Sequence, residues 1–211
     1  MPAETVVVID FETTGLSPDW GARATEVAAV RMENDEVTAT FQSLMDAGVA
    51  IPQEIEALTG ITNAMRRVAP PAAQIIRELH QFIAGAPLVA HNARFDAAFL
   101  DSEYKKAGIF CASPSFACTM KLARRIYPRA PNHKLQTLIR YADIPCQGRF
   151  HRALADATAT AHLWQQMRHD LRARYRLLEL PGYARLRRFS ALPLARIDGY
   201  IKNWPQRQVK R

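Results

Sequence analysis

Four acidic residues and one histidine have the clearest potential for chemistry. Asp10 and Glu12 stand two residues apart near the N-terminus. Strand side chains alternate between two faces, so a strand would project both carboxylates from the same face. Two carboxylates that close repel each other unless a cation lies between them, and oxygen ligands favour Mg²⁺ or Mn²⁺. The pair therefore indicates a metal site, with two solvated acids at a strand end as the alternative.

A second candidate acid, Asp96, follows the segment His91-Asn92. The apolar run from Pro87 to His91 predicts a short strand, and Asn92 is a residue type that caps the helix expected next. Asp96 would lie in the first turn of that helix, where the helix dipole alone already favours an acid. Because α/β proteins place their sites where such strands end, Asp96 is a candidate ligand in the same site.

The third cluster contains His151 and Asp156. Asp156 lies in an Ala-rich stretch that predicts a helix, and an acid surrounded by alanine and leucine indicates a specific role. His151 precedes Asp156 by five residues, which suits a mobile loop histidine that swings over a site anchored by Asp156. A surface or core histidine without a catalytic role is the alternative.

The elements that must position these residues are a strand meander followed by alternating strands and helices. This order predicts an α/β fold with a mixed sheet flanked by helices. Asn34-Asp35 is typical of a hairpin turn between two of the strands. Expected strands cover residues 5–10, 25–32, 37–44, 87–91 and 116–119, and expected helices cover 71–83, a stretch after Asn92, a stretch ending near 127, 134–141 and 153–174. Residues 48–70 and the segment after Leu180 are expected to be irregular.

Length and composition allow one domain with an extension. The chain has 211 residues, 48% of them apolar, and we expect a domain over residues 1–172 and a C-terminal extension over 173–211. No apolar run of about 18 residues and no secretion signal are found, so no membrane span is expected and the cytoplasm is the predicted location. Cys111, Cys118 and Cys146 lack disulfide or zinc-site spacing and predict reduced, mostly buried thiols.

The net charge of +8 is concentrated in the C-terminal part of the chain. Residues 171–211 hold 11 Lys/Arg and 2 Asp/Glu, whereas residues 1–170 hold 17 and 18. Such an excess indicates a polyanionic partner such as nucleic acid. The alternatives are a solvated tail that binds nothing specific, docking on a polymerase or another protein, and self-association.

The three clusters occur in the order Asp-x-Glu, Asp and His-x4-Asp. This order resembles the exonuclease motifs of the DnaQ-like DEDDh family, which includes the proofreading epsilon subunit of bacterial DNA polymerase III and, more distantly, RNase T. The resemblance covers most of residues 5–165 and excludes the C-terminal extension. It implies an RNase H-like fold and a metal-dependent 3′→5′ exonuclease that releases nucleoside 5′-monophosphates from single-stranded ends.

The resemblance also implies a role for each residue. Asp10, Glu12, Asp96 and Asp156 would hold two Mg²⁺ or Mn²⁺ ions, and His151 would be the general base toward the attacking water. Asp10 would bridge both ions. The residues implied in substrate binding are Phe11, Thr13, Thr14, Leu58, Ile61, His91, Asn92 and Phe95. Plain core packing is the alternative for Leu58, Ile61 and Phe95.

The same acids serve DNA and RNA hydrolysis, so they do not indicate whether the substrate contains deoxyribose or ribose. The motif spelling is closer to the polymerase-proofreading type, which favours DNA, and RNA 3′ ends are the alternative. A non-catalytic subunit would be expected to lack a metal carboxylate, yet all five residues are present. A basic nucleic-acid-binding module without chemistry would leave the four acids unexplained, because they would repel a phosphodiester backbone.

Overall fold

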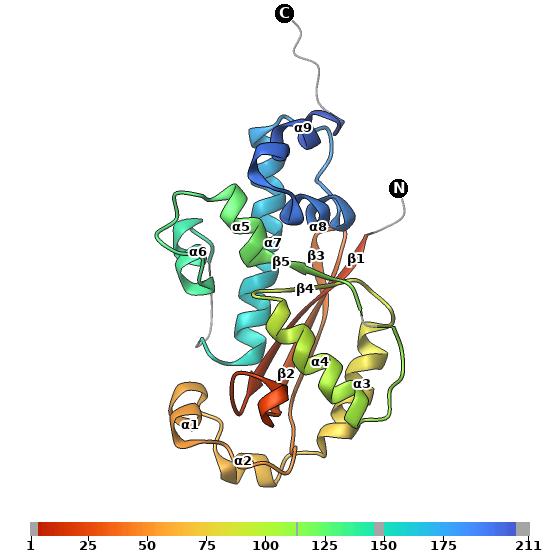
Figure 1. Cartoon of the computed structure of the whole chain (residues 1–211), viewed down its shortest axis with the longest axis vertical. Coiled ribbons are helices and arrows are strands. Elements are labelled where there is room, and N and C mark those ends of the chain that lie inside the picture. Colours follow the sequence, from red (N-terminus) through yellow and green to blue (C-terminus); the bar gives the residue numbers. More distant parts are fainter. Residues whose placement is uncertain (1–3, 113, 146–149, 206–211) are drawn as a thin grey trace, which may run out of the picture.

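A five-stranded mixed sheet forms the centre of the computed structural model, which describes residues 4–112, 114–145 and 150–205 (Figure 1). The strands are β1 (Thr5–Thr13), β2 (Ala24–Glu33), β3 (Glu36–Leu44), β4 (Leu88–Ala90) and β5 (Phe116–Cys118). They lie in the order β3-β2-β1-β4-β5. β2 pairs antiparallel with β1 and β3, whereas β4 pairs parallel with β1 and β5. The predicted mixed sheet is confirmed.

Alternating side chains of β1 divide the interior into two apolar clusters. Val6 and Val8 belong to the cluster on one face of the sheet, and Val7 and Ile9 belong to the cluster on the other. A strand buried on both faces reads as a continuous apolar run, which is why residues 5–9 show no polar alternation. β1 is therefore packed on both faces, and this packing also fixes the position of the residues at its C-terminal end.

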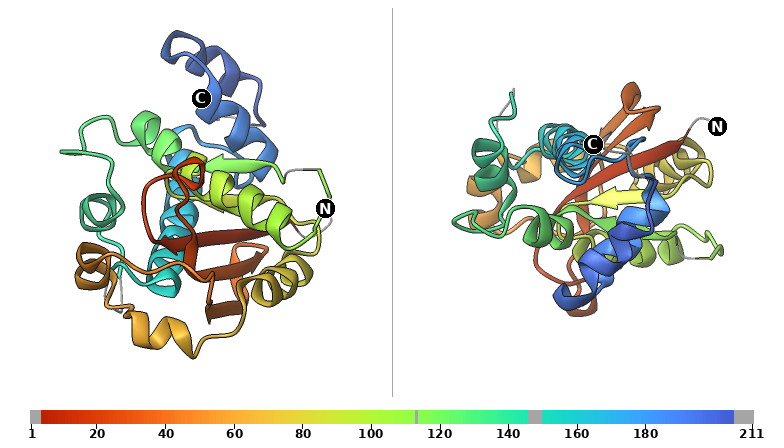
Figure 2. Two further views of the ribbon diagram at one scale, coloured as in Figure 1. Left: turned by 60° about the horizontal axis from the view of Figure 1, so that its bottom comes forward. Right: turned by 90° about the horizontal axis from the view of Figure 1, so that it is seen from above.

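Helices cover both faces of the sheet (Figures 1 and 2). They are α1 (Gln53–Thr59), α2 (Asn63–Arg67), α3 (Ala72–Ile83), α4 (Arg94–Lys106), α5 (Thr119–Ile126), α6 (Leu135–Tyr141), α7 (Ala153–Arg174), α8 (Tyr183–Ala191) and α9 (Ile197–Lys202). Two 3-10 helices span Pro18–Trp20 and Leu194–Arg196. α3 and α4 contribute to the cluster of Val7, whereas α5 to α9 contribute to the cluster of Val8.

The connection between β2 and β3 is the predicted hairpin turn. Asn34 and Asp35 have φ angles of 52° and 74°, and these two residue types tolerate the left-handed conformation well. The Asp35 carboxylate accepts a hydrogen bond from Arg168 at 2.6 Å and contacts His169 at 2.9 Å. Both partners lie on α7, so the turn also fixes that helix against the sheet.

Residues 48–70 contain α1 and α2, so the prediction of an irregular segment is wrong for these two short helices. Gly60 has φ 75° and ends α1, where its N–H bonds to the carbonyl of Glu56. Thr62 caps α2 by accepting a hydrogen bond from the N–H of Met65 at 3.2 Å. The glycine and prolines that indicated a loop instead mark the ends of short helices.

Between Leu180 and Pro205 the chain forms α8 and α9, contrary to the expected irregular segment. Leu186, Phe189 and Trp204 belong to the same buried cluster as α7. Arg168 of α7 also donates a hydrogen bond to the carbonyl of Pro181 at 3.0 Å. The proline and glycine residues that indicated an irregular segment instead flank α8 and do not interrupt it.

Predictions from composition have mixed outcomes. Cys118 is buried but Cys111 is exposed, so mostly buried thiols were the wrong expectation for Cys111. Cys146 lies outside the described residues. Among the helices of the described ranges, none is long and apolar enough to cross a membrane.

Replacing Phe189 by Ala tests whether α8 belongs to the folded core. The ring is 1% exposed, so we expect Phe189→Ala to lower the free energy of unfolding by about 3–5 kcal/mol, as for other buried aromatic truncations. Leu194→Ala is the control, because Leu194 is 71% exposed. Urea denaturation measures both. Equal stability of the two variants would contradict a core role for α8.

Candidate active site

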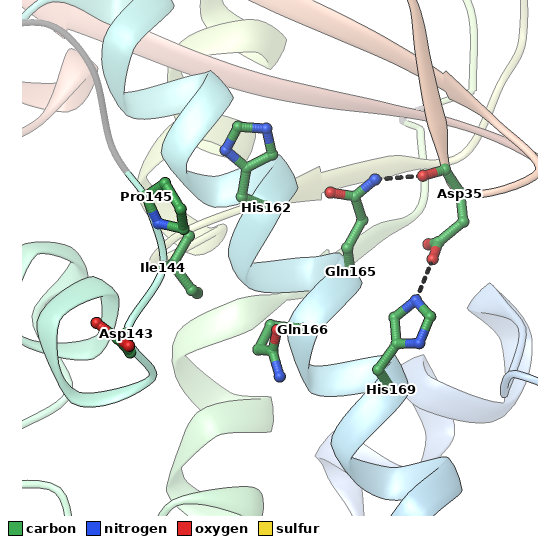
Figure 3. Close-up of a pocket in the computed structure, with 8 residues that line it drawn as sticks. All are labelled: Asp35, Asp143, Ile144, Pro145, His162, Gln165, Gln166 and His169. Atoms are coloured by element: carbon green, nitrogen blue, oxygen red, sulfur yellow. Dashed lines mark hydrogen bonds and ion pairs between the residues drawn. The ribbon is translucent and has the colours of Figure 1, made fainter.

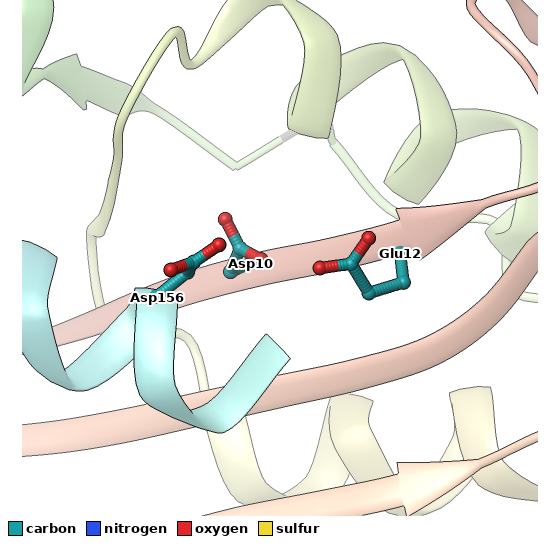
Figure 4. A group of neighbouring side chains, drawn as sticks. All are labelled: Asp10, Glu12 and Asp156. Atoms are coloured by element: carbon teal, nitrogen blue, oxygen red, sulfur yellow. The ribbon is translucent and has the colours of Figure 1, made fainter. Parts of the chain in front are cut away.

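Three carboxylates converge where β1 ends and α7 begins (Figure 4). Ligand oxygens of Asp10, Glu12 and Asp156 all lie within 4.8 Å of one another. The first two share one face of β1, and Asp156 stands in the first turn of α7. Oδ1 of Asp156 is buried and has no hydrogen-bond partner among the residues that the structure describes. Because such a carboxylate oxygen is costly to leave unpaired, the arrangement suits a cation bound among the three acids.

Asp96 approaches this group from α4. Its side chain is 2% exposed, and it occupies the first turn of the helix as the sequence indicated. Burial raises the pKa of Asp96 to about 8, while the backbone N–H groups of Asp96 and Phe11 act in the opposite direction. Asp96 is not part of the group of three, but its charge contributes to the raised pKa of Asp10. Asp96 therefore lies beside the cluster, but its carboxylate oxygens are not within the short distance that joins the other three acids.

Burial raises the pKa values of the three clustered carboxyls, and neighbouring acids raise those of Asp10 and Glu12 as well. Burial first, and then the neighbouring Asp156, raise the pKa of Glu12 to about 8. The pKa of Asp10 is well above its ordinary value because of burial first, and then because of Asp96, Asp156 and Glu12. Burial also raises the pKa of Asp156. Without metal the cluster therefore keeps protons near neutral pH, and a divalent cation would displace them.

His151 lies at the edge of a hollow of about 820 Å³ that Asp156 also lines. Its φ of 64° is left-handed, and its backbone N–H donates to Oδ2 of Asp156 at 3.1 Å. The same hollow is lined by the cationic side chains of Arg124 and Lys134. Its volume falls in the range of small-ligand sites, so it offers space for a nucleotide beside the carboxylates.

Glu26 and Arg152 are site neighbours that the sequence analysis missed. Glu26 is 1% exposed and stands opposite Glu12 in the register of β1 and β2. Arg152 donates two hydrogen bonds to its carboxylate, at 3.1 and 2.7 Å. The sequence did contain a signal, because Glu26 is the only charged residue in residues 24–30, whose other members are apolar except for Thr25. A buried charged side chain of this kind needs a partner of opposite charge, and that partner must come from an element packed against it.

Phe11, Thr13 and Thr14, which the resemblance implied in substrate binding, are largely buried. Phe11 is 4% exposed, and each threonine is 8% exposed. Thr13 Oγ1 donates to the carbonyl of Gly15 at 2.7 Å, and Thr14 Oγ1 accepts from the backbone N–H of Arg23 at 3.0 Å. These side chains shape the end of β1, so contact with a substrate would come from the backbone there.

His91 and Asn92 differ in what they offer to a ligand. The His91 ring nitrogens contact Thr119 Oγ1 at 2.9 Å and the carbonyl of His133 at 3.0 Å, and burial lowers its pKa to about 4. His91 therefore stays neutral and joins neighbouring segments. Asn92 is exposed, lines the hollow and has φ 63°. It does not cap α4 as predicted, because the N-cap residue is Ala93 and has no side-chain cap.

The three apolar candidates for substrate binding differ in how far they are exposed to solvent. Leu58 on α1 is 47% exposed, whereas Ile61 is fully buried. Phe95 is half-buried, with its ring centroid 4.8 Å from that of Phe99. Leu58 and Phe95 therefore present surface to a ligand, while Ile61 in this structure packs in the interior and supports its neighbours.

A second hollow, of about 550 Å³, lies beside α7 and is separate from the carboxylates (Figure 3). His162 and His169 line it, and His169 is held by Asp35. Within the described ranges, the group of Asp10, Glu12 and Asp156 is the one cluster of acidic, histidine or cysteine side chains close enough to share a metal ion. The second hollow therefore lacks a group of side chains that could share a metal ion.

Comparison with a protein-family model decides the family. The model described as Exonuclease matches residues 7–164, which include all three clusters. The chain belongs to this exonuclease family. The predicted resemblance is confirmed, and so is the prediction of an exonuclease as the class of enzyme.

Curated relatives include DNA polymerases of the PolC type. The chain is 41% identical over 164 residues to DNA polymerase III PolC-type of Halalkalibacterium halodurans, covering 78% of this chain and 11% of the relative. It is 35% identical over 209 residues to the PolC-type polymerase of Listeria innocua, covering 94% of this chain and 14% of the relative. The chain thus spans a small part of the length of these relatives.

Solved structures confirm the fold. Exonuclease X in complex with 5′ overhanging duplex DNA is 26% identical, with a TM-score of 0.61, covering 78% of this chain and 91% of that chain. A structure of exonuclease I has a TM-score of 0.68, covering 82% of this chain and 44% of that chain. At 18% identity the second likeness shows the fold alone. The predicted RNase H-like fold is confirmed.

The raised pKa of Glu12 predicts a pH-dependent effect on stability. Its carboxyl has a pKa near 4.5 when unfolded and about 8 when folded, so between these values the folded state binds more protons. Metal-free wild type should therefore lose stability as the pH rises through this window. In EDTA, Glu12→Gln is expected to raise the free energy of unfolding by about 1–3 kcal/mol at pH 8.5, and to change it little at pH 4.

Urea denaturation at both pH values measures this effect. Glu54→Gln is the matched control, because Glu54 is exposed on α1. An equal change at pH 4 and pH 8.5 would show that Glu12 carries no excess proton in the folded chain.

Proposed function

We propose that the protein is a metal-dependent 3′→5′ exonuclease that releases nucleoside 5′-monophosphates from single-stranded nucleic acid, with DNA as the favoured substrate. The observation that carries this proposal is the convergence of Asp10, Glu12 and Asp156 within 4.8 Å inside an exonuclease fold. Membership of the exonuclease family supports the reaction class.

Asp10, Glu12 and Asp156 are the residues that would hold the metal, with Asp96 completing the site directly or through water. We infer two ions, Mg²⁺ or Mn²⁺, because four carboxylates exceed what one hard cation needs from a protein that must also bind phosphate. The unpartnered oxygen of Asp156 and the raised pKa of Glu12 both fit a cation site. Such ions would lower the pKa of a bound water and neutralise charge on the phosphate.

His151 is proposed as the general base. Its backbone is held by Asp156, and its side chain borders the hollow next to the carboxylates. An imidazole has a pKa near working pH, about 6.5 when unperturbed, so it can take a proton from the attacking water and return it to solvent.

The hollow beside the carboxylates is proposed to receive the terminal nucleotides. Arg124 and Lys134 would contact phosphates, and the exposed Asn92 offers an amide. Leu58 and Phe95 would pack on the last base, a contact that does not read base identity. Sequence preference is therefore expected to be weak, and affinity is expected to fall as salt rises.

DNA is favoured over RNA on the comparisons. The relatives are DNA polymerases, and Exonuclease X was solved in complex with duplex DNA that carries an overhang. We propose a role in DNA replication or repair, with a polymerase as the partner class. RNA 3′ ends are the second candidate, because the carboxylates act on either backbone. The exposed arginines of α8 would bind the body of the substrate or the partner.

Replacing one metal carboxylate tests the enzyme directly. With Mg²⁺, the wild type is expected to shorten 5′-labelled single-stranded DNA from the 3′ end and to act more slowly on the matching RNA. Asp10→Asn should abolish this ladder, because it removes a carboxylate that the ions need. EDTA should do the same. Denaturing gel electrophoresis measures the products.

Asp198→Asn is the control, since Asp198 is an exposed acid on α9. An intact wild-type substrate with both Mg²⁺ and Mn²⁺ would refute the proposed activity. Faster degradation of RNA would refute the preference for DNA alone.

Replacing His151 by Gln tests the general base. The expected result is a fall in kcat of about 100-fold or more, because general-base catalysis typically contributes 10²–10⁴. The pH dependence of the wild-type rate should also differ from that of the variant, because the variant has no base at this position. His169→Gln is the control, because His169 lies near the other end of α7. A variant that keeps the wild-type pH profile would exclude His151 from proton transfer.

A further inference from the structure

Glu26 is a buried acid outside the metal cluster. It is 1% exposed and stands opposite Glu12 on the neighbouring strand. A fifth carboxylate next to four others increases their mutual repulsion, and it contributes to the raised pKa values of Glu12 and Asp10. Placing it there is unfavourable unless its own charge is neutralised and hydrogen-bonded.

The partners of Glu26 come mainly from the start of α7. Arg152 donates to both carboxylate oxygens, at 3.1 and 2.7 Å, and the backbone N–H of Ala153 donates at 3.1 Å. Gln42 of β3 adds a hydrogen bond at 2.8 Å. Burial alone would raise the pKa of Glu26, but the hydrogen bonds from Arg152, Ala153 and Gln42 outweigh it and lower the pKa. Glu26 is therefore charged and joined to α7.

α7 receives its N-terminal cap from this strand. Its N-cap residue is Arg152, whose side chain makes no cap hydrogen bond. The N–H of Ala153, which the helix itself cannot satisfy, instead donates to Glu26. The same turn holds the N–H of His151 on Asp156 at 3.1 Å. Hydrogen bonds thus link Glu26 of β2 to the first turn of α7, and within that turn they link His151 to Asp156.

We propose that Glu26 and Arg152 are positioning residues for the hydrolytic site. The pair fixes the start of α7 against β2, which places Asp156 beside Asp10 and Glu12 and holds His151 at the hollow. A two-point contact between guanidinium and carboxylate sets both distance and orientation, which an apolar pair would not do. The inference rests on the proposed function for its kinetic readout, and its metal-binding readout is independent of activity.

The protein contains a matched control pair. Glu103 is 2% exposed, and Arg23 donates to its two oxygens at 2.8 and 2.9 Å. Glu103 also accepts a backbone N–H, that of Ala24, at 3.3 Å. Glu103 therefore has the same kinds of hydrogen-bond partner as Glu26, but these partners, Arg23 and Ala24, lie outside α7. Glu103→Gln removes an equivalent buried ion pair and leaves the start of α7 untouched.

The experiment compares Glu26→Gln with Glu103→Gln. We measure kcat and KM on a single-stranded DNA oligomer, and Mn²⁺ binding by electron paramagnetic resonance, at a temperature where both variants are folded. Glu26→Gln is expected to lower kcat and weaken Mn²⁺ binding by about 10–100-fold, as when groups that orient metal ligands are removed. KM should change little. Glu103→Gln should keep wild-type values for all three.

Equal losses in the two variants would overturn the proposal, because Glu26 would then act only through stability. If Glu26→Gln does not fold, Arg152→Lys gives the same test, since it keeps the charge and removes the two-point contact. If the wild type hydrolyses neither DNA nor RNA, the proposed function fails. Mn²⁺ binding then decides the positioning role alone, and wild-type affinity in Arg152→Lys would refute it.

Discussion

Electrostatic repulsion among acids governs the structure around the end of β1. Asp10, Glu12 and Asp156 lie within 4.8 Å of one another, and Asp96 is buried beside them. Proteins rarely bury like charges this close, because each raises the cost of ionising the others. The fold must therefore hold the carboxylates in place until a cation neutralises them. That requirement explains why a strand buried on both faces and two helices supply them.

Neutralised charge elsewhere makes this arrangement possible. Two ion pairs with buried acids tie helices to β2: Arg23–Glu103 joins α4 to the residue before β2, and Arg152–Glu26 joins the start of α7 to β2. Each satisfies its acid with a guanidinium and a backbone N–H. The site thus combines unpaired acids, which suit a ligand, with one paired acid, Glu26, which fixes the start of α7.

Local patterns predicted most of the fold and the identity of the clustered acids. The alternation of β1 placed Asp10 and Glu12 on one face, and the Ala-rich stretch placed Asp156 on a helix. Contacts between segments that are far apart in the sequence could not be predicted from such local patterns. Glu26 meets Arg152 across 126 positions of sequence, and α8 packs in a core cluster with residues far from it in the sequence. Exposure of Leu58 and burial of Ile61 likewise depend on what packs around α1 and α2.

Late assembly of the site follows from the position of α7. The helix that carries Asp156 comes after every strand of the sheet, so a chain growing on the ribosome completes the sheet before this ligand emerges. Contacts across such long separations also form slowly, because a large loop must close first. Until α7 has been synthesised and has packed on the sheet, the nascent chain therefore lacks one of the three clustered carboxylates.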